Sequence, residues 1–115
     1  MMSGVQLPQR IDKPWGYELI WAHTNYYVGK ILHIKAGEQL SLQYHIEKDE
    51  TIYIMSGTLL LAVDNITVRM ASGMSYHIPP KARHRLTALS TCDVLEASTI
   101  EIDDIVRLDD RYGRS

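Results

Sequence analysis

The chain has 115 residues with 12 basic and 14 acidic side chains, and a net charge of −2 excludes the basic excess of a nucleic-acid-binding surface. Its length, hydrophobic fraction of 45% and charged fraction of 23% are ordinary for one globular domain. A single cysteine, Cys92, excludes an intrachain disulfide, and no apolar run approaches the roughly 20 residues of a membrane helix. No signal-peptide pattern is visible, so we expect a cytoplasmic protein that binds neither membranes nor nucleic acids.

The N-terminal segment, residues 1–12, is polar and aperiodic, so we expect it to be flexible and the domain to span residues 13–115. Beyond it, short segments rich in β-branched and aromatic residues alternate between apolar and polar side chains, as half-buried strands do. The predicted strands cover residues 17–22, 27–35, 40–45, 50–55, 58–63, 66–70, 75–78, 85–89, 93–97 and 104–108. Asp64-Asn65, between two of them, is a two-residue loop typical of a tight hairpin.

The regular spacing of these strands predicts the fold class. No window has an apolar stripe of 3.6-residue period and helical length, and many short strands separated by turn signals indicate an all-β sandwich or barrel. A chain this short favours one compact jelly-roll barrel. A small barrel leaves strand edges exposed, and a two-fold dimer would cover them, so we expect a homodimer.

Four polar side chains suggest a metal site. Gln43 and His45 lie two residues apart on a predicted strand, so both point to one face. Glu50 begins the next strand after a short polar turn, where a hairpin returns it close to His45. His84 opens another strand just after the Pro79-Pro80 turn. An amide oxygen, two imidazoles and a carboxylate form a ligand set that suits Zn, Mn, Fe, Co or Ni.

We therefore predict one divalent metal ion as the cofactor, bound by Gln43, His45, Glu50 and His84, with the identity of the metal left open. Four protein ligands leave one or two coordination positions for water or substrate, which catalysis requires.

The spacing of these residues resembles the two sequence motifs of cupins. The residues that resemble the first motif are Gly37, Gln43, His45, Glu50 and Gly57. Those that resemble the second motif are Gly73, Pro79 and His84. Gln43 stands where the first motif has a histidine, and Lys81 stands where the second has a glycine.

Gln43 narrows the resemblance to the cupin domain of bacterial type II mannose-6-phosphate isomerases, which often follows a mannose-1-phosphate guanylyltransferase domain. The segments that carry this resemblance are 13–17, 40–43, 78–79, 84–86 and 103–114. The resemblance implies a cupin barrel, the four-residue metal site, a dimer and an aldose–ketose isomerase ancestry. The chain departs from the family at 46–48, where Ile-Glu-Lys replaces a frequent run of histidines.

From this resemblance we expect a metal-dependent isomerase that moves a proton between adjacent carbons of a sugar phosphate. Arg85 or a basic neighbour would bind the phosphate, and His77, Lys35 or a metal-bound hydroxide would act as the base. One alternative is a non-catalytic cupin that binds a sugar or another metabolite. Another is a small metal-dependent oxygenase, against which Gln43 argues because three histidines and a carboxylate are commoner there.

Overall fold

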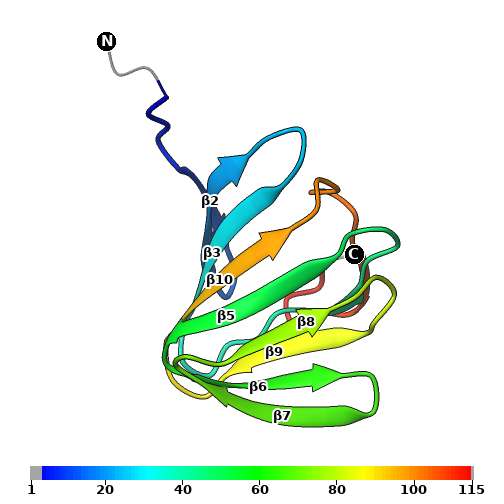
Figure 1. Ribbon diagram of the computed structural model, residues 1–115. Helices are drawn as coiled ribbons and strands as arrows, with labels where there is room; N and C mark the ends of the chain where they lie inside the picture. The colour runs from blue at the N-terminus through cyan, green and yellow to red at the C-terminus, as the bar shows by residue number, and fades with distance from the viewer. Residues whose placement is uncertain (1–3, 115) are drawn as a thin grey trace.

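The fold consists of two antiparallel β-sheets, seen in a computed structural model that describes residues 4–114 (Figure 1). The strands are β1 (Gln9–Lys13), β2 (Gly16–His23), β3 (Val28–Ile34), β4 (Leu42–Tyr44), β5 (Glu50–Ser56), β6 (Thr58–Val63), β7 (Ile66–Ala71), β8 (Ser75–Ile78), β9 (His84–Ala88), β10 (Cys92–Ser98) and β11 (Val106–Asp109). Each of the ten predicted strands overlaps one of these. The described residues contain no helix, and therefore none that could cross a membrane.

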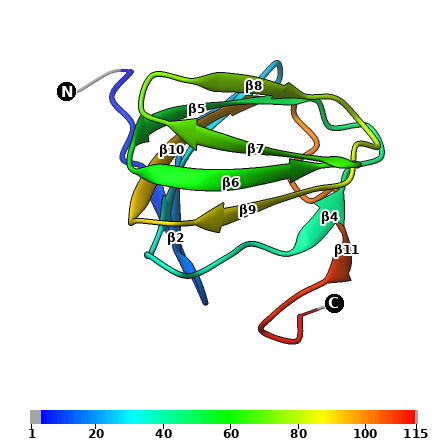
Figure 2. The ribbon, with the colours of Figure 1, turned by 90° about the horizontal axis from the view of Figure 1, so that it is seen from below.

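The two sheets enclose one core. The first sheet has the strand order β1-β2-β3-β10-β5-β8, and the second has the order β11-β4-β9-β6-β7. In Figures 1 and 2, β5 and β8 lie along one side of the molecule and β6, β7 and β9 along the other. Buried apolar side chains of both sheets fill the space between them, including Ile34, Ile54, Leu59, Leu61 and Val94. The predicted all-β jelly-roll barrel is therefore confirmed.

Alternation of side chains along each strand explains why these segments form a barrel. Along β5, Glu50, Ile52 and Ile54 are buried, whereas Thr51 and Tyr53 are exposed. Successive side chains of a strand point to opposite faces, so one face of β5 enters the core and the other faces outward. The same alternation recurs in β6, β9 and β10.

The barrel interior changes from apolar to charged along its length. On β3, Leu32 and Ile34 are buried in the apolar core, and Lys30 is buried on the same face. On β10, Val94 belongs to the core and Glu96 is buried two residues further on. Burying charged side chains without partners is costly, so this end of the interior must supply partners or a ligand.

Part of the segment expected to be flexible, residues 1–12, contributes to the first strand of the sheet. Residues Gln9–Lys13 form β1, which pairs with β2 and brings Lys13 opposite Gly16. This strand is mostly exposed, so main-chain hydrogen bonds at the sheet edge hold it, and the apolar pattern gives little sign of it. Gly16 allows a close turn, because a Cβ there would lie 1.9 Å from the carbonyl oxygen of His33. Residues 1–3 of the expected segment, and Ser115 at the end of the predicted domain, lie outside the described residues.

Candidate metal centre

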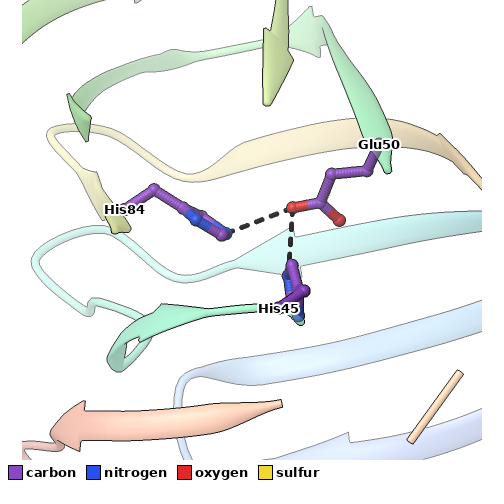
Figure 3. Close-up of side chains that lie close together, drawn as sticks. All are labelled: His45, Glu50 and His84. Atoms are coloured by element: carbon purple, nitrogen blue, oxygen red, sulfur yellow. Dashed lines mark ion pairs between the residues drawn. The ribbon is translucent and has the colours of Figure 1, made fainter. Parts of the chain in front are cut away.

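Three of the predicted ligands meet at the charged end of the interior. His45 follows β4, Glu50 begins β5 and His84 begins β9, and all three side chains are at least 95% buried. The Oε1 atom of Glu50 lies 3.1 Å from Nε2 of His84 and 3.4 Å from Nε2 of His45 (Figure 3). One ligand atom from each residue lies within 4.8 Å of the other two, a spacing that one metal ion can bridge.

The protonation of both imidazoles is fixed by main-chain carbonyls. Nδ1 of His45 lies 2.5 Å from the carbonyl oxygen of Asp104, and Nδ1 of His84 lies 2.9 Å from that of Ala82. A carbonyl oxygen accepts hydrogen bonds, so each Nδ1 must carry the donated proton. In the neutral imidazole, Nε2 then carries the lone pair that a metal ion needs, and both Nε2 atoms face Glu50.

Gln43 lies beside these ligands. It is the register partner of His84 between β4 and β9, and paired residues of antiparallel strands project to the same face. Its Oε1 atom accepts a hydrogen bond of 2.6 Å from the hydroxyl of Ser41, which keeps one acceptor lone pair available. The structure thus brings all four predicted ligands to one end of the barrel.

The charges around Glu50 keep its carboxylate ionised. Burial works to raise the pKa of Glu50, but the adjacent side chains of His45 and His84 and the charge of Lys48 hold it well below the usual value. The Lys48 ammonium lies 3.1 Å from Oε2 of Glu50 and 3.1 Å from Oε2 of Glu96. Burial lowers the pKa of Lys48, but the charges of Glu96 and Glu50 raise it more, so the ammonium stays charged.

These residues fit a divalent cation. Nε2 of His45 is buried and makes no hydrogen bond to any described residue. This nitrogen lone pair faces the ionised carboxylate of Glu50 and the Nε2 lone pair of His84. The three groups repel one another unless a positive charge lies between them. A nitrogen–oxygen set of this kind suits Zn²⁺ and the first-row transition metals.

A cavity of about 370 Å³ lies next to the metal centre. Its wall includes Gln43, His45, Glu18, Lys30, Lys48 and Glu96. Lys30 and Glu18 form a second buried ion pair, with Nζ and Oε1 3.6 Å apart. The four charged residues of this wall were not predicted from the sequence: Glu18, Lys30, Lys48 and Glu96. The apolar side chains of Val28 and Leu32, two residues to either side, indicate that Lys30 points inward.

The segment after β10 closes this end of the barrel. The carboxylate of Asp104 accepts hydrogen bonds from the backbone N–H groups of Ile46, Glu47 and Lys48, at 3.0, 2.7 and 2.9 Å. The main-chain carbonyl of Asp104 also orients His45. Asp104 therefore fixes the loop that joins His45 and Glu50, two of the predicted metal ligands.

None of the three residues predicted to act on substrate lines this cavity, and their roles stay predictions. Arg85 points to the other face of its sheet and donates hydrogen bonds to the carbonyl oxygens of Leu40 and Asp109. His77 is exposed and lies 2.6 Å from Asp49, because Ile78 takes the inward position beside Glu50. Lys35 is exposed just beyond the end of β3.

Comparison with known proteins agrees with this geometry. A family described as "Mannose-6-phosphate isomerase C-terminal" matches residues 2–110. The chain belongs to this family. The mannose-1-phosphate guanylyltransferase of Escherichia coli (strain K12) is 35% identical to it over 112 residues, which are 92% of this chain and 23% of that protein. The alginate biosynthesis protein AlgA of Pseudomonas aeruginosa is 34% identical over 111 residues, 91% of this chain and 23% of that protein.

The likeness to solved structures establishes that this member of the mannose-6-phosphate isomerase family has the cupin fold. An RmlC-like cupin from Shewanella frigidimarina superposes with a TM-score of 0.76 at 12% identity, over 84% of this chain and 86% of that one. The chain spans less than a quarter of the length of the curated relatives named above. The shared part is thus a single cupin domain.

Proposed function

We propose that this cupin domain is a metal-dependent isomerase that interconverts a phosphorylated aldose and ketose. The observation that carries the proposal is a buried His45–Glu50–His84 centre beside a charged cavity of about 370 Å³, in a chain of the mannose-6-phosphate isomerase family. The cavity volume lies within the usual range of small-molecule sites.

In this proposal Gln43, His45, Glu50 and His84 hold the metal ion. A divalent cation there would polarise the carbonyl oxygen of the sugar and stabilise the negative charge that develops during proton transfer. Lys48 keeps the Glu50 carboxylate in position through its ion pair. The carboxylates and ammonium groups of Glu18, Lys30 and Glu96 on the cavity wall offer acceptors and donors to sugar hydroxyls.

The proposed isomerase reaction concerns only the cupin domain that this chain shares with its longer relatives. The names of those relatives refer to guanylyl transfer and polysaccharide biosynthesis in proteins about four times as long. We assign the sugar-phosphate isomerase reaction to the matched domain because the metal centre and its cavity are built entirely from this domain's residues.

Turnover by the metal-loaded chain tests the proposal. Mannose 6-phosphate supplied to the purified protein should yield fructose 6-phosphate after loading with Zn²⁺, Mn²⁺, Co²⁺, Fe²⁺ or Ni²⁺. His84→Ala should lose both metal and turnover, whereas His23→Ala, which changes an exposed histidine, should retain both. Saturable sugar-phosphate binding without turnover would instead support the non-catalytic alternative. Turnover that persists in metal-free His84→Ala would overturn the metal-dependent reaction.

A further inference from the structure

A second cavity, which we call the outer cavity, has a volume of about 280 Å³. It lies where the turn between β2 and β3 meets the end of β10 and the start of β5 (Figure 1). Ala97 and Thr51 pair in register there and are exposed. Glu50, next to Thr51, is buried with its side chain in the interior. The outer cavity and the metal centre therefore lie on opposite faces of β5.

Two tyrosine rings form one side of the outer cavity. Tyr26 is 85% exposed and Tyr27 is 55% exposed, and both line the cavity. The hydroxyl of Thr24 accepts hydrogen bonds from the backbone N–H groups of Tyr26 and Tyr27, at 3.1 and 3.2 Å. The backbone N–H of Thr24 donates to the carbonyl oxygen of Tyr27, at 3.0 Å. The turn therefore presents two aromatic rings from a fixed backbone, where they can contact apolar C–H groups of a ligand.

Polar groups form the opposite side of the outer cavity. The backbone N–H of Asp49 donates to Oγ1 of Thr99, and the backbone N–H of Thr99 donates to the carbonyl oxygen of Asp49, both at 3.0 Å. Oδ1 of Asp49 lies 2.6 Å from Nε2 of His77, which leaves Oδ2 of Asp49 for hydrogen bonds from a ligand. Thr51 adds an exposed hydroxyl. Because these groups are already held in place, ordering them around a ligand costs little entropy.

The charge of the outer cavity disfavours an anionic ligand. None of the described residues that line it is a lysine or an arginine, whereas the cavity next to the metal centre contains Lys30 and Lys48. A matching ligand has an apolar face for the tyrosines, several hydroxyls for the polar side and no negative charge. A sugar ring combines C–H groups on its face with hydroxyls at its edge. The volume is close to roughly 300 Å³, the lower limit of small-molecule sites, which suits a ligand of one or two rings.

We propose that the outer cavity binds a neutral saccharide, with one sugar ring packed against Tyr26 and Tyr27 and its hydroxyl groups hydrogen-bonded to the carboxylate of Asp49. This binding depends neither on a metal ion nor on the proposed isomerase reaction, because every contact comes from the outer face of the sheet. A glycoside should therefore bind, although its blocked anomeric carbon prevents the ring opening that an isomerase needs.

Nuclear magnetic resonance titration of the full chain tests the proposal with three probes: methyl α-mannoside, methyl β-glucoside and methyl β-galactoside. At least one probe should shift the backbone amide signals of Tyr27, Asp49 and Thr99 saturably, with a Kd of about 1 mM or weaker, as expected for a small ligand at an open site. Tyr27→Ala and Asp49→Asn should each weaken this binding by roughly 10-fold. Tyr53→Ala, which removes an exposed tyrosine of β5 outside the cavity, is the matched control and should bind as the unmodified chain does.

Other results would overturn the saccharide site. If no probe shifts these signals at about 100 mM, the outer cavity does not bind saccharides. If Tyr26→Ala and Tyr27→Ala both bind a probe as tightly as Tyr53→Ala, the tyrosines do not contact the sugar. Tyr26→Ala also serves if Asp49→Asn does not fold, because the exposed Tyr26 ring contributes nothing to the core.

Loading the chain with Zn²⁺ separates this inference from the proposed function. Glycoside binding should be equal with and without the metal ion, whether or not the chain isomerises a sugar phosphate. Binding that requires Zn²⁺, or signal shifts confined to the cavity next to the metal centre, would place the sugar there and contradict the outer site.

Discussion

Residues outside the predicted ligand set fix the tautomer and orientation of the imidazoles of His45 and His84. Each donates its Nδ1 proton to a main-chain carbonyl, that of Asp104 for His45 and that of Ala82 for His84. A main-chain acceptor survives side-chain substitution, so the tautomer depends on the fold itself. The position of each Nε2 atom is therefore set by the strands and loops around it.

Replacement of Lys48 should lower the free energy of unfolding of the metal-free protein. In Lys48→Met the carboxylates of Glu50 and Glu96 remain buried together without their shared cation. Breaking a buried ion pair from one side costs about 3–5 kcal/mol, so the free energy of unfolding should fall by about that amount. Urea unfolding of the metal-free protein measures it.

The matched control for Lys48→Met is Lys35→Met, because Lys35 is an exposed lysine just after β3. Its unfolding free energy should stay within about 0.5 kcal/mol of the unmodified protein. Equal stability of the two variants would show that the Lys48 ion pairs contribute nothing.

At the scale of single residues, the clustering of His45, Glu50 and His84 could be predicted from the sequence better than the cavity around it. Gln43 and His45 could be placed on one face because strand periodicity is regular, and Glu50 follows them after a short turn. Arg107 could not be found in this way, because its place depends on pairing with Gln43 across a long stretch of chain. The exposure of His77 could not be predicted either, because it follows from the pairing of β8 with β5, in which Ile78 lies opposite Glu50.

At the scale of structural elements, the segment from Glu101 to Arg114 connects the candidate metal centre to the cavity beside it. It contributes β11, six of the residues that line the cavity and the hydrogen bonds of Asp104. Tyr112 donates a hydrogen bond to Glu38, and Arg111 donates one of 2.7 Å to the carbonyl of Gly37. These contacts hold the end of the segment against the loop after β3.

Asp104→Ala should weaken metal binding although Asp104 is not a ligand. The substitution leaves three backbone N–H groups of the 46–48 loop without their acceptor, so His45 and Glu50 lose their fixed separation. Loss of such a supporting residue typically lowers metal affinity 10- to 100-fold, and we expect an effect of about that size. Titration against a chromophoric chelator measures the affinity.

Asp12→Ala is the control for Asp104→Ala. The Asp12 side chain is 81% exposed, and its ion pair is with Arg10 and not with the 46–48 loop. Equal metal affinity of the two variants would contradict a role for Asp104 in positioning His45 and Glu50.

The closing segment should also make the protein sensitive to acid. Hydrogen bonds and the charge of Arg114 lower the pKa of Asp110 to about 2, and backbone N–H groups of residues 46–48 lower that of Asp104. A carboxyl whose folded pKa lies below its unfolded value of about 4 stabilises the fold above that value. This contribution is lost as the pH falls from about 4 toward 2.

Chemical unfolding at a series of pH values checks this expectation. The free energy of unfolding should decrease below about pH 4, and Asp104→Asn and Asp110→Asn should each reduce the slope. A slope unchanged in both variants would contradict the assignment of acid sensitivity to the closing segment.

The alternation of apolar and polar residues was sufficient to predict the ten strands β2 to β11. It was insufficient for β1, in which Ile11 is the only aliphatic residue and the exposed edge supplies no burial pattern. The order of the strands in each sheet could not be predicted from the sequence pattern either. For example, β10 lies between β3 and β5, which both precede it in the chain. Such pairings depend on long-range contacts that local periodicity does not encode.

At the scale of the whole molecule, the outer face of the first sheet is the surface on which we expect a second copy to bind. Leu19, Ile31, Leu95 and Tyr53 form a row across four neighbouring strands, each paired in register with the next. Their strand neighbours point into the core, so this row faces outward and is partly or fully exposed. A row of this kind can pair with itself across a two-fold axis.

Light scattering with size-exclusion chromatography tests the dimer. The unmodified chain should have the mass of a dimer, and Leu95→Glu should shift it to a monomer that remains folded. Ile66→Glu, which changes an exposed residue of β7 on the other sheet, should stay dimeric. A monomeric parent chain, or a dimeric Leu95→Glu variant, would refute this interface.

The most direct measurement of the central claim is a crystal structure of the metal-loaded protein with anomalous data at the metal absorption edge. We expect one strong anomalous peak about 2.0–2.2 Å from Nε2 of His45, Nε2 of His84 and a carboxylate oxygen of Glu50, with Oε1 of Gln43 as the fourth protein ligand. A peak elsewhere, or no peak between these side chains at saturating metal, would contradict the account.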